Sequence, residues 1–114
     1  MRLKDKVAVV TGSGRGIGEG IVLRFAAEGA KIVVNDVNET DAKNVVEKVR
    51  AQKGQAISVI GSVASRAVVQ QAIDTAVKEF GTLDIMVNNA GITRDSILHK
   101  MTDEQWNQVV AVNL

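Results

Sequence analysis

The sequence predicts a doubly wound α/β fold, in which a parallel sheet is covered by helices on both faces. Four short apolar runs are near-continuous rather than alternating, which is typical of parallel strands buried on both sides. Segments of helical periodicity separate these runs, and the connections are short. Strict alternation with short connections favours right-handed crossovers between parallel strands. The predicted strands are Val7–Val10, Ile32–Val34, Ala56–Ile60 and Ile85–Val87.

Apolar stripes at helical spacing indicate helices between the strands. The clearest stripe consists of Val68, Val69, Ala72, Ile73, Ala76, Val77 and Phe80. The stripe of the preceding helix consists of Ala42, Val45, Val46 and Val49. Ser65 is placed to cap the start of the clearest helix. A glycine follows each of the first three helices, where a left-handed residue commonly ends a helix: Gly29, Gly54 and Gly81.

The last segment is also predicted to be a helix. Thr102–Gln105 fits a capping box, in which the first and fourth residues satisfy the free N–H groups of the first turn. The helix that follows would bury Trp106, Val109, Val110 and Leu114. The predicted order is therefore β-α-β-α-β-α-β-α within one domain that spans residues 1–114.

The composition excludes several classes of function. A formal charge of +1 offers no electrostatic footprint for nucleic acid or a membrane surface. The absence of cysteine excludes a disulfide framework and a thiolate metal site, and a single histidine, His99, leaves little for zinc. The first apolar run, Val7–Val10, is too short for a signal peptide or a membrane span. We therefore expect a cytoplasmic protein.

A glycine-rich loop joins the first strand to the first helix, and it reads Thr11-Gly12-Ser13-Gly14-Arg15-Gly16-Ile17-Gly18. Glycine adopts positive φ without cost, as a strand that reverses into a helix requires. The missing side chains also let a pyrophosphate approach the N–H groups at the helix N-terminus, where the helix dipole favours an anion. The spacing is T-G-x-x-x-G-x-G rather than G-x-G-x-x-G. The alternative is an ordinary glycine-rich turn, but the position between strand and helix favours a dinucleotide site.

Asp36 closes the segment Lys31–Asp36, which contains the second predicted strand, and is followed by Val37. A carboxylate at this place can accept hydrogen bonds from both hydroxyls of an adenosine ribose. It would repel a 2′-phosphate, because two anions at hydrogen-bond distance disfavour each other in a partly desolvated site. Arg15 acts in the opposite direction, because its guanidinium could pair with that phosphate. The sequence favours NAD and leaves NADP open.

Three separated motifs resemble the short-chain dehydrogenase/reductase superfamily, and within it the 3-oxoacyl-[acyl-carrier-protein] reductases. The first motif is Thr11–Gly18. The second is Asn88-Asn89-Ala90-Gly91, extended as Ile92-Thr93-Arg94-Asp95, and the third is Val112-Asn113-Leu114. The resemblance runs from Lys6 to Leu114. It implies a Rossmann fold with strand order 3-2-1-4, which leaves the strand at Ile85–Val87 at the edge of the predicted sheet.

The resemblance also implies the residues that contact the cofactor. The glycine loop would hold the pyrophosphate through Gly12, Ser13, Gly14, Arg15, Gly16, Ile17 and Gly18. Asp36 and Val37 would meet the adenosine, and Asn89, Ala90 and Gly91 would run beside the cofactor. Ser62-Val63 stands where the family often has Asp-Val near the adenine ring, which puts the contact to the adenine amino group in doubt.

Asn113 matches the asparagine of the family's Asn-Ser-Tyr-Lys catalytic tetrad, which helps hold a water in a proton relay. In the predicted helix Asn113 lies on the apolar face, four residues after Val109, where a polar side chain needs a partner. A structural asparagine is the alternative reading. The printed 114 residues contain no tyrosine, so the tetrad's proton donor is absent from them. We therefore expect these residues alone to be inactive and to form part of a longer enzyme.

The function implied by the resemblance is reduction of a 3-oxoacyl thioester or a similar carbonyl by NAD(P)H, with a role in fatty acid metabolism. The family also implies a homo-oligomer, commonly a tetramer, and we expect the uncovered strand edge and the Trp106 face to promote association. Two alternatives remain from the residues. One is a module that binds a dinucleotide without catalysis. The other is a nucleotide-binding transferase, which is disfavoured by the segment Asn88–Gly91 and by the position of Asn113.

Overall fold

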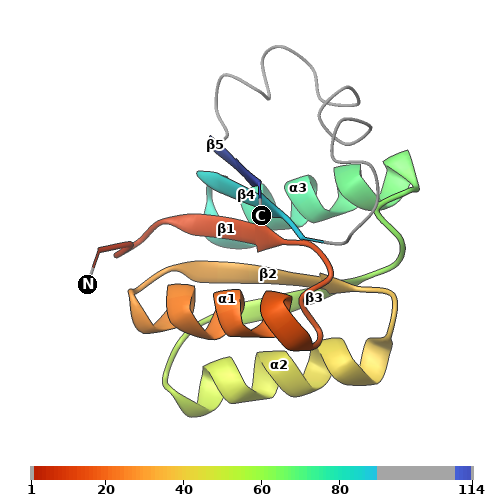
Figure 1. Cartoon of the computed structure of the whole chain (residues 1–114). Helices are drawn as coiled ribbons and strands as arrows, with labels where there is room; N and C mark the ends of the chain where they lie inside the picture. The colour runs from red at the N-terminus through yellow and green to blue at the C-terminus, as the bar shows by residue number, and fades with distance from the viewer. Residues whose placement is uncertain (1, 90–109, 114) are drawn as a thin grey trace.

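The computed structural model describes residues 2–89 and 110–113. These residues form a parallel sheet of five strands in the order β3-β2-β1-β4-β5 (Figure 1). The strands are β1 Val7–Val10, β2 Lys31–Asp36, β3 Ala56–Ile60, β4 Ile85–Asn88 and β5 Val110–Asn113. The helices are α1 Gly16–Ala27, α2 Glu39–Ala51 and α3 Arg66–Phe80. The predicted strand order 3-2-1-4 and the alternation of strands with helices are confirmed.

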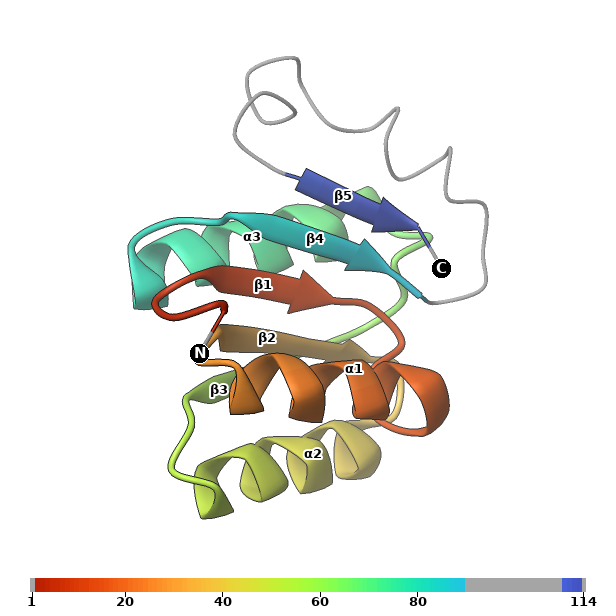
Figure 2. The same cartoon turned by 60° about the vertical axis from the view of Figure 1, so that its left-hand side comes forward.

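Helices cover both faces of the sheet, as the continuous apolar strands predict. Figures 1 and 2 show α1 and α2 on one face and α3 on the other. Alternate residues of β1 serve the two layers: Val7 and Val9 pack in the cluster with α3, whereas Ala8 and Val10 pack in the cluster with α1 and α2. Every residue of β1 is buried because each side chain meets a helix. The core is therefore two apolar layers separated by the sheet.

The helix ends agree with the sequence prediction at two places and differ at a third. Gly81 after α3 and Gly29 after α1 have φ values of 88° and 95°, in the left-handed region that glycine favours. After α2 the left-handed residue is Lys53, with φ 66°, rather than the predicted Gly54. Gly54 is restricted for another reason, because a Cβ there would lie 2.9 Å from the Val49 side chain.

The predicted helix is wrong at Val110–Asn113, which forms β5. This strand pairs with β4 in parallel, from Ile85 opposite Val110 to Asn88 opposite Asn113. The prediction that β4 lies at an uncovered edge is therefore also wrong. The physical reason is that a short apolar run such as Val110-Ala111-Val112 suits a buried strand as well as a helix, and β4 offers it an open ladder of N–H and C=O groups. Trp106 and the capping segment lie outside the described residues.

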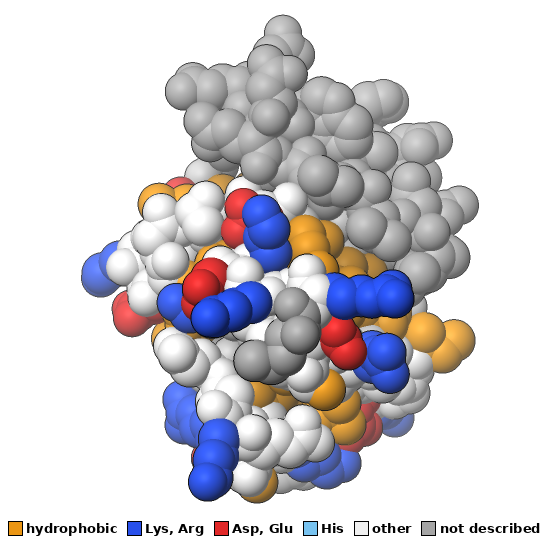
Figure 3. Space-filling view, turned by 90° about the vertical axis from the view of Figure 1, so that its left-hand side faces the viewer, with side chains coloured by type: hydrophobic (Ala, Val, Ile, Leu, Met, Phe, Trp, Pro, Cys, Tyr) orange, Lys and Arg blue, Asp and Glu red, His pale blue; other side chains and the backbone are white. Residues whose placement is uncertain are grey.

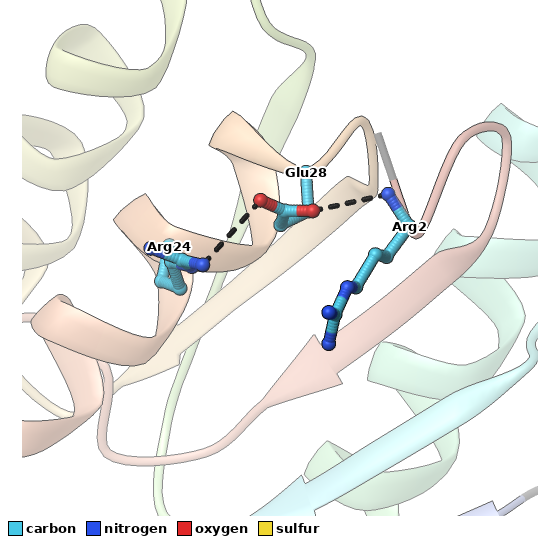
Figure 4. Close-up of polar contacts among 3 residues, drawn as sticks. All are labelled: Arg2, Arg24 and Glu28. Carbon is cyan, nitrogen blue, oxygen red and sulfur yellow. Dashed lines mark hydrogen bonds and ion pairs between the residues drawn. The ribbon is translucent and has the colours of Figure 1, made fainter.

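The N-terminal segment is joined to the end of α1, at the amino ends of the strands. The Glu28 carboxylate accepts a hydrogen bond from the Arg2 backbone N–H at 3.0 Å and pairs with Arg24 at 3.5 Å (Figure 4). The Arg2 N–H, followed by the Arg24 charge, holds the pKa of Glu28 below its usual value. Figure 3 shows this end of the molecule, where Lys and Arg side chains lie among Asp and Glu side chains.

Candidate functional site

A cleft of about 460 Å³ opens at the carboxyl ends of β1, β2 and β3. Because the strands are parallel, the segments that follow them meet at one edge of the sheet, which is where ligands bind in open α/β folds. One wall is the loop after β1, the base is the end of β2, and the opposite wall follows β3. The lining residues are Gly12, Arg15, Gly16, Asn35, Asp36, Val37, Gly61, Ser62 and Val63.

The N-terminus of α1 faces this cleft without a side-chain cap. Arg15 occupies the N-cap position and makes no side-chain hydrogen bond to the first turn. At α2, by contrast, the Asn38 side chain accepts a hydrogen bond from the Asp41 N–H at 2.9 Å. Gly16 begins α1 with φ 63°, and a Cβ there would have nothing within 4 Å. The start of α1 therefore has no side-chain cap and has free space at Gly16, and the free N–H groups of an uncapped first turn suit an anion.

Asp36 is held in place by two backbone N–H groups. Its carboxylate accepts hydrogen bonds from Gly14 at 2.9 Å and from Asn38 at 3.0 Å. A Cβ on Gly14 would lie 2.8 Å from both an Asp36 oxygen and the Asp41 Cβ. Gly14 is thus required by the protein's own packing. Each carboxylate oxygen keeps acceptor capacity for a further donor, so the group is oriented before a ligand arrives.

Two loop residues predicted to contact a cofactor lie inside the protein. Ser13 is fully buried, and its hydroxyl donates to the Val10 carbonyl oxygen at 2.7 Å. Gly18 is buried as well, and a Cβ there would lie 2.2 Å from the Gly12 carbonyl oxygen and 2.6 Å from the Asn89 amide nitrogen. In this structure both residues contact other parts of the protein and hold the loop in its conformation.

The end of β4 is tied to the glycine loop from the other side. The Asn89 backbone N–H donates to the Thr11 hydroxyl at 2.9 Å, and its side-chain amide donates to the Gly12 carbonyl oxygen at 3.3 Å. The neighbouring Asn88 is buried, and among residues 2–89 and 110–113 neither polar atom of its side chain has a hydrogen-bond partner. Ala90 and Gly91, both predicted to run beside a cofactor, lie outside the described residues.

The wall that follows β3 has an apolar and a polar member. Val63 is buried in the α3 layer, and Ser62 is exposed. The Ser62 hydroxyl accepts a hydrogen bond from the Ala64 N–H at 3.1 Å, which stabilises the turn into α3. Two large apolar side chains are exposed at the cleft or next to it: Val37 at 68% and Ile17, which follows Gly16, at 73%. Exposed apolar groups beside open N–H groups suit a ligand with flat apolar rings and a charged centre.

Asn113 lies at the end of β5, opposite Asn88 in the register. Its predicted position on the apolar face of a helix is wrong, because Val110–Asn113 is a strand. The register nevertheless brings Asn113 to the same edge of the sheet as the cleft, since it ends a parallel strand there.

The sequence reading missed two residues that line the cleft, Asn35 and Gly61. Asn35 is buried, and its side-chain amide donates to the carbonyl oxygens of Val59 at 3.0 Å and Gly61 at 3.2 Å. The available signal was a polar residue that directly extends the apolar run Ile32–Val34, because such a residue must find partners in a covered sheet.

Size alone does not select this cleft. A second cleft of about 470 Å³ lies at the amino ends of the strands and is lined by three lysines among other residues: Lys4, Lys31 and Lys53. It adjoins the C-termini of α1 and α2, where the helix dipoles disfavour an anion. In the described part of the chain, no group of three His, Cys, Asp or Glu side chains could hold a metal ion. No helix among residues 2–89 and 110–113 is long and apolar enough to cross a membrane.

Comparison with known proteins places this geometry in a family. The model of the short chain dehydrogenase family matches residues 6–114. The chain belongs to the short chain dehydrogenase family. Members of this family bind NAD or NADP as a class, and the resemblance found in the sequence is confirmed.

Individual relatives agree with this assignment. The chain is 36% identical over 114 residues to the 3-oxoacyl-[acyl-carrier-protein] reductase FabG of Thermotoga maritima, covering all of this chain and 46% of that protein. It is 44% identical over 111 residues to the short-chain reductase protein NovJ of Streptomyces niveus, covering 97% and 42%. The crystal structure of a Caenorhabditis elegans glucose dehydrogenase in the apo-form matches with a TM-score of 0.83 at 27% identity, covering 97% of this chain and 55% of that one. The chain spans less than half the length of the two curated relatives.

Proposed function

We propose that this chain forms the dinucleotide-binding part of an NAD-dependent oxidoreductase that interconverts a carbonyl group and an alcohol. The observation that carries the proposal is the Asp36 carboxylate, fixed by two backbone N–H groups beside the uncapped N-terminus of α1. An acceptor for ribose hydroxyls and a donor set for pyrophosphate thus share one cleft. An adenosine diphosphate needs both features, a site for its pyrophosphate and an acceptor for its ribose hydroxyls.

Each part of the cleft has a proposed partner in the cofactor. The first-turn N–H groups of α1 hold the pyrophosphate, and Gly16 leaves it room. Asp36 accepts from the adenosine ribose. The adenine ring lies against Val37 and Val63, with Ser62 at its polar edge. The cofactor, when bound, supplies the hydride to the substrate carbonyl, and this chain's residues orient it and exclude water.

Charge and donor supply favour NAD over NADP. A 2′-phosphate would lie against the Asp36 carboxylate, and the Gly14 and Asn38 N–H groups that could have received it already donate to that carboxylate. Arg15 is exposed at the cleft and is the one nearby cation among the lining residues described. A single solvated cation offsets little of the repulsion between two anions at close range.

The substrate we propose is a 3-oxoacyl thioester or a related carbonyl, by analogy with the reductase of Thermotoga maritima. Asn113 is proposed to hold a water in the proton relay, at the edge of the sheet where the carboxyl ends of the strands lie. We further propose a cytoplasmic homo-oligomer. Since residues 1–114 contain no tyrosine, we expect them on their own to bind the cofactor without turnover, and a binding-only module is the second candidate function. Steady reduction of a ketoacyl thioester by the purified protein would exclude that candidate.

Asp36→Ala tests the cofactor assignment. The variant should raise the Kd for NAD at least about tenfold, because it removes one or two charge-assisted hydrogen bonds of about 1.5–3 kcal/mol each. It should leave or improve the Kd for NADP, since Gly14 and Asn38 regain free N–H groups. Alanine is preferable to asparagine, whose amide would present a donor to another donor.

Calorimetric titration with NAD and NADP measures both affinities. Asp74→Ala is the matched control, because it removes an exposed carboxylate on α3 that bonds to Gln70. If the affinities for both cofactors are unchanged in Asp36→Ala, the assignment of the ribose to Asp36 is wrong.

A further inference from the structure

Asn35 connects both walls of the cleft from a buried position. Its exposed fraction is 2%, and it lies at the base of the cleft between the glycine loop and the segment after β3. The side-chain amide donates one hydrogen bond to the Val59 carbonyl oxygen at 3.0 Å and one to the Gly61 carbonyl oxygen at 3.2 Å. Neither donor is therefore free for a ligand.

The bond to Gly61 reaches beyond the end of the sheet. β2 pairs with β3 up to Asp36 opposite Ile60, so Gly61 is the first residue past the ladder. Gly61 has φ 143° and turns the chain toward α3. A Cβ on Gly61 would lie 2.7 Å from the Val68 side chain. Its N–H donates to the Asp36 carbonyl oxygen at 3.0 Å. Asn35 and Asp36 thus fix both polar groups of the residue that begins the cleft wall.

The backbone of Asn35 holds the opposite wall. Its N–H donates to the Ser13 hydroxyl at 3.1 Å, and its carbonyl oxygen accepts from the Ser13 N–H at 2.8 Å. Ser13 lies between Gly12 and Gly14, in the loop that faces the cleft. One buried residue therefore bonds to the loop on one side and to Val59 and Gly61 on the other.

We propose that Asn35 is a positioning residue that sets the separation of the two cleft walls and thereby the affinity for the adenosine half of the cofactor. The inference rests on the proposed dinucleotide site. A hydrophobic residue of similar size could fill the same buried volume, but it would leave the turn at Gly61 attached to the sheet through its N–H alone. A ligand that must contact both walls loses affinity when their separation is no longer fixed.

Asn35→Ala should raise the Kd for AMP and the Kd for NADH by the same factor, about tenfold, as for the loss of one hydrogen-bonded constraint. The factors match because the lost contacts all lie in the adenosine half, which both ligands share. Ser13→Ala keeps Asn35 and removes the hydroxyl that accepts its N–H, so it should give the same pattern with a smaller factor. This second variant decides the question if Asn35→Ala does not fold.

Val33→Ala is the matched control for a loss of stability alone. Val33 is fully buried on the same strand, in the layer with α3, and does not line the cleft. It should lower the unfolding midpoint and leave both Kd values unchanged in the purified protein.

Unchanged AMP affinity in Asn35→Ala, or a loss of the same size in Val33→Ala, overturns the positioning role. So does a loss of NADH affinity with no loss for AMP. A failure of the wild-type protein to bind NADH and AMP at all would instead overturn the proposed function.

Discussion

Gly16 and Gly18 lie two residues apart in one loop, yet a side chain would meet opposite surroundings at the two positions. A Cβ on Gly18 would lie 2.2 Å from the Gly12 carbonyl oxygen, whereas a Cβ on Gly16 would have nothing within 4 Å. Gly14 resembles Gly18, because Asp36 and Asp41 occupy the space where its Cβ would be. The loop therefore has a packed side that holds it to the sheet and an open side that faces the cleft. Its glycines serve two different purposes.

Gly18→Ala tests the packed side and should have the largest effect. The new methyl group overlaps the Gly12 carbonyl, so the start of α1 and the preceding loop must move apart, at a cost of about 3 kcal/mol in the free energy of unfolding. Gly20→Ala is the matched control, because it adds a methyl group to the same helix with nothing within 4 Å. That control should stabilise the protein by about 0.5–1 kcal/mol.

Urea unfolding of both variants measures this difference. If Gly18→Ala is as stable as the wild-type protein, the distinction between the two sides of the loop is wrong.

Gly16 variants test the open side. Gly16→Ala and Gly16→Val both place a side chain at φ 63°, which costs about 1–2 kcal/mol of stability, and more for the branched valine. Only the larger side chain fills the space in front of the α1 N-terminus, so Gly16→Val should abolish NADH binding while Gly16→Ala retains part of it. Fluorescence titration of the folded variants checks this. Normal titration of folded Gly16→Val would contradict the placement of the pyrophosphate.

Much of this arrangement could be predicted from the sequence. The near-continuous runs at Val7–Val10 and Ala56–Ile60 gave the strand bounds that the structure has, because a strand covered on both faces has few polar positions. The strand order came from the family resemblance. The carboxyl-end location of Asp36 followed from its place after a strand, since parallel strands deliver their ends to one edge.

The rest depends on contacts between residues far apart in the chain. Val110–Asn113 could not be distinguished from a helix, because the ladder of β4 decides its conformation. The separate purposes of Gly14 and Gly16 were equally hidden, since only the folded chain brings Asp36 against one and leaves the other open. The buried position of the Asn35 amide is explained by its hydrogen bond to Gly61, which lies 26 residues away in the sequence.

Lys53→Gly tests a position outside the loop where a residue other than glycine has positive φ. Its effect on stability should be the smallest of those predicted here. Lys53 has φ 66°, so glycine should relieve the strain and stabilise the protein by about 0.5–1 kcal/mol. Gly81→Ala is the converse change, at φ 88°, and should destabilise by about 1 kcal/mol. Thermal unfolding measures both. Neither should alter NADH affinity, and a less stable Lys53→Gly would show that the lysine side chain contributes more than its backbone costs.

The location of the cofactor is the central claim, and an amide NMR titration of the purified protein with NADH tests it most directly. The largest shifts should fall on Gly16, Val37 and Ser62, which come from three separate segments of one cleft. Little change is expected at Lys31 and Lys53, in the cleft of similar size at the amino ends of the strands. Shifts confined to Lys31 and Lys53, or no shifts at saturating NADH, would contradict the account.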